Sequence, residues 1–120
     1  MERKELFEEM LQVIEELQSK QEEKVIEEDM LSGKWGMINP IILQITKDVY
    51  SDINFKNAEQ RDSEIKFRKY NTYEVQETLA QIDKLNSSIK KLDIEIEFLQ
   101  NKFKCYKVAY GGSGLIWRGK

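Results

Sequence analysis

The segment from Gly114 to Lys120 has the glycine and lysine spacing of a phosphate-binding loop. In such a loop, backbone N–H groups cradle the phosphate oxygens and the lysine neutralises their charge. The chemistry requires small residues where the backbone approaches the phosphate, but the interior positions here hold leucine, isoleucine and tryptophan. We interpret the spacing as a coincidence and predict no nucleotide site.

Adjacent glutamates could serve acid–base catalysis or bind a cation. Four such doublets occur: Glu8/Glu9, Glu15/Glu16, Glu22/Glu23 and Glu27/Glu28. Neighbouring helical residues point about 100° apart, so the two carboxylates of a doublet do not converge on one substrate. The chain also has no histidine, the commonest general base and metal ligand. We therefore predict a solvated acidic surface, no metal or other cofactor, and no catalytic centre.

Cys105 is the single cysteine of the sequence. Without a histidine to act as base it lacks the partner of a catalytic thiol, and we expect it to be a packing or idle residue. A lone cysteine cannot form an internal disulfide, which favours a reducing compartment. The first residues form a mixed charged segment rather than an apolar one. We expect a cytoplasmic protein that does not cross a membrane.

Cations alternate with aromatic rings between residues 102 and 120. The candidate partner-binding residues of this segment are Lys104, Lys107, Tyr110, Trp117 and Arg118. This mixture suits phosphate contact with base stacking, but it equally suits docking on an acidic protein surface or packing at the end of a bundle. The sequence pI of about 5.2 weighs against general nucleic-acid binding.

The two ends of the chain have opposite charge. Residues 1–31 hold eleven acidic and four basic side chains, whereas residues 98–120 hold five basic and no acidic ones. Charges of opposite sign attract, so either the two ends meet or each meets a different partner.

The elements that would position these residues are helical. A nearly ideal heptad seam marks one long helix, expected over residues 72–106. The seam residues are Ile82, Leu85, Ile89, Leu92, Ile96, Leu99, Phe103 and Tyr106. An exposed single helix would leave this stripe in water, so another helix must cover it.

The identity of the covering helix is open at this level. Parallel pairing of two seams would match Ser88 with Asp93, Glu95 with Gln100 and Lys102 with Lys107, and none of these is a salt bridge. Ile94 and Phe98 also lie outside the seam, where a bare two-stranded coil would expose them. We favour a helical-hairpin bundle that covers this pair and dimerises through part of the seam; a parallel zipper and a monomer are the alternatives.

The whole chain, residues 1–120, is expected to form one mostly helical domain. An acidic amphipathic helix is predicted over residues 3–31, with Gly33 as its cap, followed by a loop over residues 33–39. A short helix over residues 40–52 would begin with Asn39 as cap and Pro40 in its first turn. Residues 65–70 alternate with a period of two, which permits a short strand. A helix is the rival interpretation, because Glu59 to Lys69 contains no helix breaker. The tail, residues 107–120, could be a helix with a loose end or a β-hairpin.

These features favour a non-enzymatic, self-associating coiled-coil protein, a homodimer or higher homo-oligomer. It would act on a protein partner as a small scaffold, adaptor or inhibitor. A bias toward Lys, Ile, Asn and Glu is typical of AT-rich genomes and is consistent with a phage or mobile-element protein. The alternative is a nucleic-acid-associated factor that uses the basic aromatic tail. An enzyme would need a polar pocket that the sequence does not reveal.

Overall fold

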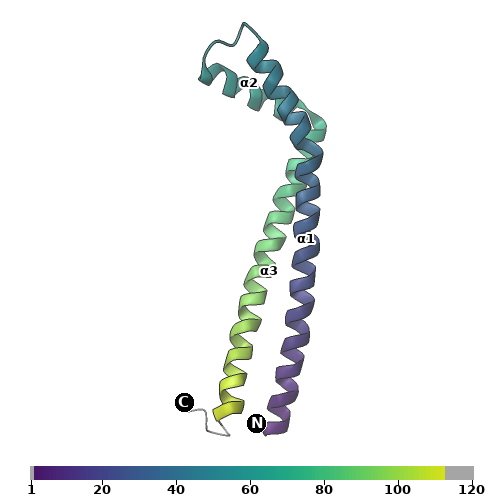
Figure 1. The fold of residues 1–120 in the computed structure, drawn as a ribbon, viewed down its shortest axis with the longest axis vertical. Helices are drawn as coiled ribbons and strands as arrows, with labels where there is room; N and C mark the ends of the chain where they lie inside the picture. Colours follow the sequence, from purple (N-terminus) through teal and green to yellow (C-terminus); the bar gives the residue numbers. More distant parts are fainter. Residues whose placement is uncertain (1, 113–120) are drawn as a thin grey trace. The chain divides into compact units, whose positions relative to one another are not determined.

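The computed structural model describes residues 2–112, which form three α-helices (Figure 1). These are α1 (Arg3–Ser51), α2 (Ala58–Asn71) and α3 (Tyr73–Gly112). No strand occurs among these residues, so the predicted all-α class is confirmed. The contacts divide the chain into two compact units, the first formed by Met1–Glu27 with Ser88–Lys120 and the second by Glu28–Ser87.

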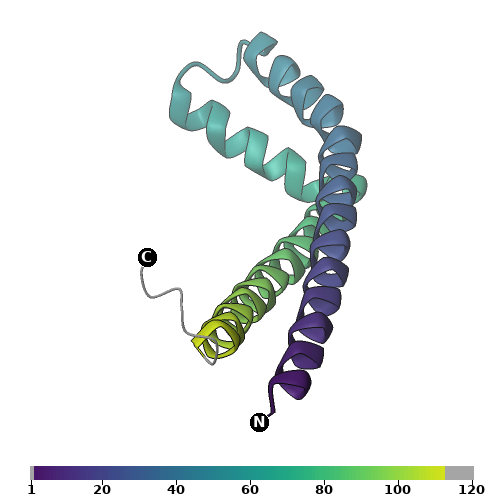
Figure 2. The same ribbon diagram turned by 60° about the horizontal axis from the view of Figure 1, so that its bottom comes forward.

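The first unit is a helical hairpin. The beginning of α1 and the end of α3 run alongside each other in opposite directions (Figures 1 and 2). Its buried apolar side chains recur at helical spacing on both helices: Leu6 and Val13 from α1, and Leu92, Ile96 and Leu99 from α3. Burial of one stripe from each helix is what holds a pair of amphipathic helices together.

The second unit has its own core where α1 and α3 meet. Ile38 of α1 is buried with Val75 and Ile82 of α3. Half-buried apolar residues surround this cluster, namely Leu31, Ile41, Ile42 and Leu79. By contrast, α2 buries no residue completely. The stability of this unit therefore depends mainly on α1 and α3.

The predicted loop over residues 33–39 and the predicted helix start at Asn39 are wrong. α1 continues without interruption through Gly33, Gly36 and Pro40. Helical glycine costs about 1 kcal/mol relative to alanine, and Pro40 cannot donate the usual backbone hydrogen bond to the Gly36 carbonyl. Helical geometry nevertheless places Ile38 in the core, fully buried. Burial of the apolar face around Ile38 outweighs the local preference for a break.

Two further ambiguities are resolved as helix. The alternating segment 65–70 lies inside α2, whose first turn is capped by Asn57 Oδ1 accepting from the Gln60 N–H at 2.9 Å. The described part of the tail is also helical, because α3 extends through Tyr110 to Gly112. A β-hairpin that begins at residue 107 is therefore wrong. Its second half, residues 113–120, lies outside the described residues.

Candidate interaction surface

The heptad seam lies inside the chain's own helix packing. Its buried members are Ile82, Leu92, Ile96 and Leu99, and its half-buried members are Leu85, Ile89, Phe103 and Tyr106. In the first unit, the beginning of α1 covers the seam. In the second unit, Ile82 packs with Ile38 of α1. The seam therefore forms the core of the hairpin that one chain makes by itself.

Two ion pairs flank the seam in the first unit. Lys20 Nζ lies 3.2 Å from Glu95 Oε2, and Lys24 Nζ lies 2.5 Å from Asp93 Oδ1. Both pairs are partly exposed, so each contributes at most about 1 kcal/mol. These ion pairs help to fix the register of the two helices, because they hold residues 20–24 of α1 next to residues 93–95 of α3.

The ends of α1 and α3 meet through aromatic contacts. The Phe7 and Tyr110 ring centroids are 6.0 Å apart, and the Arg3 guanidinium carbon lies 4.4 Å from the Tyr110 centroid. Such contacts contribute about 0.5–1.5 kcal/mol each. Of the two alternatives that the charge distribution left open, the meeting of the ends holds for these residues, although the contacts are aromatic and cation–π contacts, and Tyr110 is engaged within the chain.

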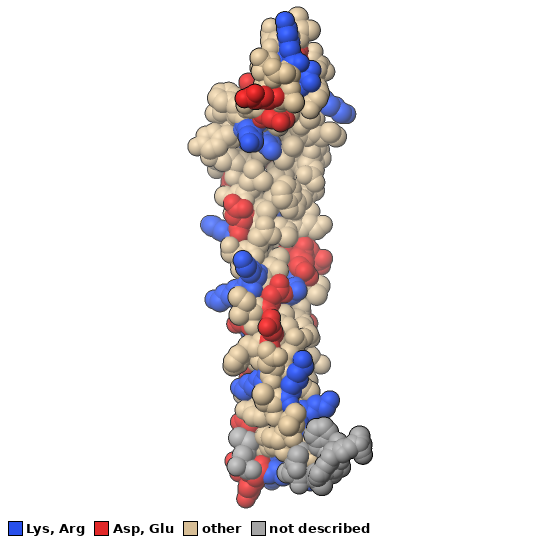
Figure 3. Space-filling view, turned by 90° about the vertical axis from the view of Figure 1, so that its left-hand side faces the viewer, with Lys and Arg blue, Asp and Glu red and all other residues tan. Residues whose placement is uncertain are grey.

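The structure describes two of the other four residues of the predicted partner site. Lys104 and Lys107 are exposed on α3. Trp117 and Arg118 lie outside the described residues. On the face shown in Figure 3, positive and negative side chains are interspersed rather than gathered by sign. This face lacks the one-signed patch that is the usual electrostatic footprint of nucleic-acid binding.

A second apolar stripe lies on α3, opposite the seam. Ile94 is 65% exposed, Phe98 64% and Val108 58%. Cys105 and Asn101 are also exposed. We call Ile94, Phe98, Asn101, Cys105 and Val108 the outer stripe. The expectation that a bundle covers Ile94 and Phe98 is wrong for the single chain, because α1 packs on the seam and leaves the opposite face of α3 uncovered.

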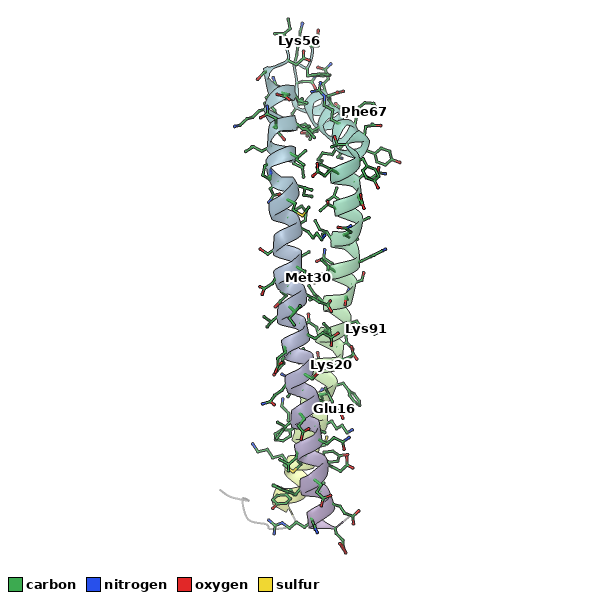
Figure 4. The ribbon with its side chains drawn as sticks, turned by 90° about the vertical axis from the view of Figure 1, so that its right-hand side faces the viewer. Glu16, Lys20, Met30, Lys56, Phe67 and Lys91 are labelled. Atoms are coloured by element: carbon green, nitrogen blue, oxygen red, sulfur yellow. The ribbon has the colours of Figure 1, made fainter. Side chains whose placement is uncertain are left out.

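An open groove between the two helices of the first unit includes Ile94 and Phe98 of the outer stripe. It is lined by Glu16, Lys20, Ile94, Glu95, Phe98 and Leu99. Glu16 and Lys20 are labelled on α1 in Figure 4. The groove places apolar surface of α3 next to charged groups of α1, which is the arrangement of an apolar interface centre with a polar rim.

The second unit also exposes large aromatic side chains that were not among the predicted site residues. Phe67 and Tyr70 of α2 and Tyr73 of α3 are all exposed; Phe67 is labelled in Figure 4. The pKa of Tyr73 is raised, mainly by its hydrogen bond to the Glu77 carboxylate and to a lesser extent by the negative charge of that carboxylate. The signal available in the sequence was the i, i+3 spacing of Phe67 and Tyr70, which the competing strand interpretation obscured.

Arginines hold α2 against the rest of the second unit. The Arg61 guanidinium carbon lies 4.9 Å from the Tyr50 ring centroid, and that of Arg68 lies 5.8 Å from the Phe55 centroid. Arg61 Nε also donates to the Phe55 carbonyl at 3.3 Å. These partly exposed contacts position the helix without giving it a core of its own.

Neither a metal cluster nor a membrane-spanning helix is found in the described part of the chain. Within residues 2–112, no three His, Cys, Asp or Glu side chains gather as a metal site would require. None of the described helices combines the length and the apolar composition needed to cross a bilayer. Comparisons with protein-family models, with curated proteins and with solved structures find no match for this chain.

Proposed function

We propose that this chain is a non-enzymatic helical protein that self-associates and acts through protein–protein contacts, as a small cytoplasmic scaffold, adaptor or inhibitor. The observation that carries the proposal is the exposure of Ile94 and Phe98 on α3, at 65% and 64%. A monomer would keep these neighbouring side chains in water. Apolar surface of this kind, rimmed by charged groups, marks protein interaction sites.

Covering Ile94 and Phe98 in a dimer would favour association by about 2–4 kcal/mol per chain. Complete burial of a large apolar side chain contributes about 1.5–3 kcal/mol. Since about two thirds of each side chain is exposed, covering Ile94 and Phe98 would contribute roughly 2–4 kcal/mol per chain. Each partner in a symmetric dimer contributes this amount, and the gain offsets part of the entropic cost of association.

The experiment compares two double variants by sedimentation velocity over a range of concentrations. Ile94→Ser/Phe98→Ser removes exposed apolar surface from α3. Val25→Ser/Ile26→Ser removes comparable surface from α1, where these residues are 55% and 60% exposed. We expect the wild type and the α1 variant to associate and the α3 variant to sediment as a monomer.

Circular dichroism of both variants shows whether each retains its helices. A wild type that remains monomeric at every concentration would contradict self-association. If both variants self-associate as strongly as the wild type does, the contact lies on another surface.

A further inference from the structure

We propose that the outer stripe of α3 pairs with the outer stripe of a second copy of this chain, in parallel and in register. The inference rests on the proposed self-association and specifies its surface and geometry. All five stripe residues belong to the first unit, on the face of α3 opposite the buried seam.

The spacing of the outer stripe is that of a coiled-coil seam. Its residues follow one another at intervals of four, three, four and three. An average spacing of about 3.5 residues keeps a stripe facing a partner helix along its whole length. On the N-terminal side, the same stripe continues with Lys91 and Ser87, which are polar and exposed. The apolar contact is therefore confined to residues 94–108.

The flanking charges complement each other in a parallel pair. In parallel coiled coils, a residue beside the seam faces the residue five positions later on the other helix. For the outer stripe, Lys90 would face Glu95 of the second copy, and Glu97 would face Lys102 of the second copy. Both are attractive pairs, and symmetry makes each occur twice.

The side chains for these pairs are at least partly accessible in the structure. Lys90 and Glu97 are exposed, and Lys102 is half-buried beside the Tyr106 ring. Glu95 already pairs with Lys20, but a carboxylate has two oxygens and accepts more than one donor. The seam on the inner face offers no attractive pair of this kind, which distinguishes the outer stripe from it.

Asn101 decides the orientation. An antiparallel pair that set Glu97 against Lys104 of the second copy would also be attractive, so the charges alone do not choose. That stagger would place the Asn101 amide against the Phe98 ring of the second copy. The parallel pair instead sets Asn101 beside Asn101 of the second copy, where the two amides can donate to and accept from each other. A single polar residue at a core position of a coiled coil can specify its register, at a cost in stability.

Cys105 is the natural reporter of this geometry, because the parallel pair brings it next to Cys105 of the second copy. The experiment oxidises the full chain with copper–phenanthroline at low protein concentration and resolves the products on a non-reducing gel. Two variants calibrate it. Cys105→Ser/Val108→Cys moves the thiol along the outer stripe, and Cys105→Ser/Gln100→Cys moves it to an exposed position outside the stripe.

We expect the wild type and the Val108 variant to form covalent dimers and the Gln100 variant to remain uncrosslinked. Equal crosslinking of all three would indicate random collision and overturn the inference. A dimer in sedimentation whose Cys105 does not crosslink would overturn the parallel outer-stripe contact and leave the proposed self-association standing. A monomer in sedimentation would overturn both.

A charge exchange gives an independent measurement. Glu97→Lys replaces an attractive pair by a repulsive one and should raise the dimer Kd roughly 2- to 10-fold. Adding Lys102→Glu restores opposite charges and should return the Kd toward the wild-type value. If the double variant binds no better than the single one, Glu97 and Lys102 do not face each other in the dimer.

Discussion

The Phe7 and Tyr110 rings lie 6.0 Å apart and tilted by 41°, joining the beginning of α1 to the end of α3. This contact closes the first unit at the end where the two helices start and finish. It also explains why Tyr110, predicted as a partner-binding residue, is engaged by the chain itself.

Tyr110→Ala should lower the free energy of unfolding by about 1–2 kcal/mol, because a half-buried ring and its contacts with Phe7 and Arg3 are lost. Urea denaturation followed by circular dichroism measures the change. Tyr70→Ala is the matched control, since Tyr70 is 69% exposed and should change stability by less than about 0.5 kcal/mol. Equal effects of the two substitutions would mean that the Phe7–Tyr110 contact does not stabilise the chain.

Leu92→Asp places a carboxylate in the middle of the seam, at a side chain that is buried in the first unit. We expect a loss of about 3–5 kcal/mol, which combines lost apolar burial with the cost of desolvating a charge. Gln100→Asp introduces the same side chain at an exposed position of α3 and serves as the control. If the melting temperature of Leu92→Asp matches that of the control, the seam is not the core of the hairpin.

Gly33→Ala and Gly36→Ala should each stabilise the chain by about 0.5–1 kcal/mol. Both glycines lie within α1, and a Cβ built at either position meets no atom within 4 Å. Alanine therefore gains helix propensity without a clash. Thermal melts of the two single variants and of their combination test this. Destabilisation by either alanine would contradict the expectation that helix propensity alone decides the effect at these two positions.

Salt-sensitive binding of nucleic acid is not expected from the basic segment of α3. Fluorescence anisotropy at low salt, with labelled single-stranded and duplex oligonucleotides, should show no binding by the wild type. The triple substitution of Lys104, Lys107 and Arg118 by Glu is the control for any signal. Binding by the wild type that the triple variant loses would favour the nucleic-acid alternative over a protein-contact function.

The features predictable from the sequence are those that repeat along a helix. The seam residues follow a heptad, and the structure buries or half-buries all of them. The heptad periodicity predicts that another helix covers the stripe, but it does not predict whether that helix belongs to the same chain. The identity of the covering helix depends on where α1 packs, and no local pattern in α3 determines this.

The errors arose where local signals conflicted with distant packing. Gly33, Gly36 and Pro40 predict a break, yet Ile38 is buried against Val75 and α1 remains continuous. Propensity is a local quantity of about 1 kcal/mol per glycine, and it yields when burial of a whole apolar face depends on continuing the helix. Likewise, the apolar pair Ile94 and Phe98 is recognisable in the sequence, but its exposure depends on which face of α3 packs against α1.

The measurement that tests the central claim most directly is the absolute mass of the wild-type chain by light scattering after size exclusion, over a range of loading concentrations. The chain has a mass of 14.2 kDa. Self-association predicts a mass of twice this value at the higher concentrations, falling toward that of a single chain on dilution. A mass equal to that of one chain at every concentration would contradict the account, because the apolar face of α3 would then remain in water.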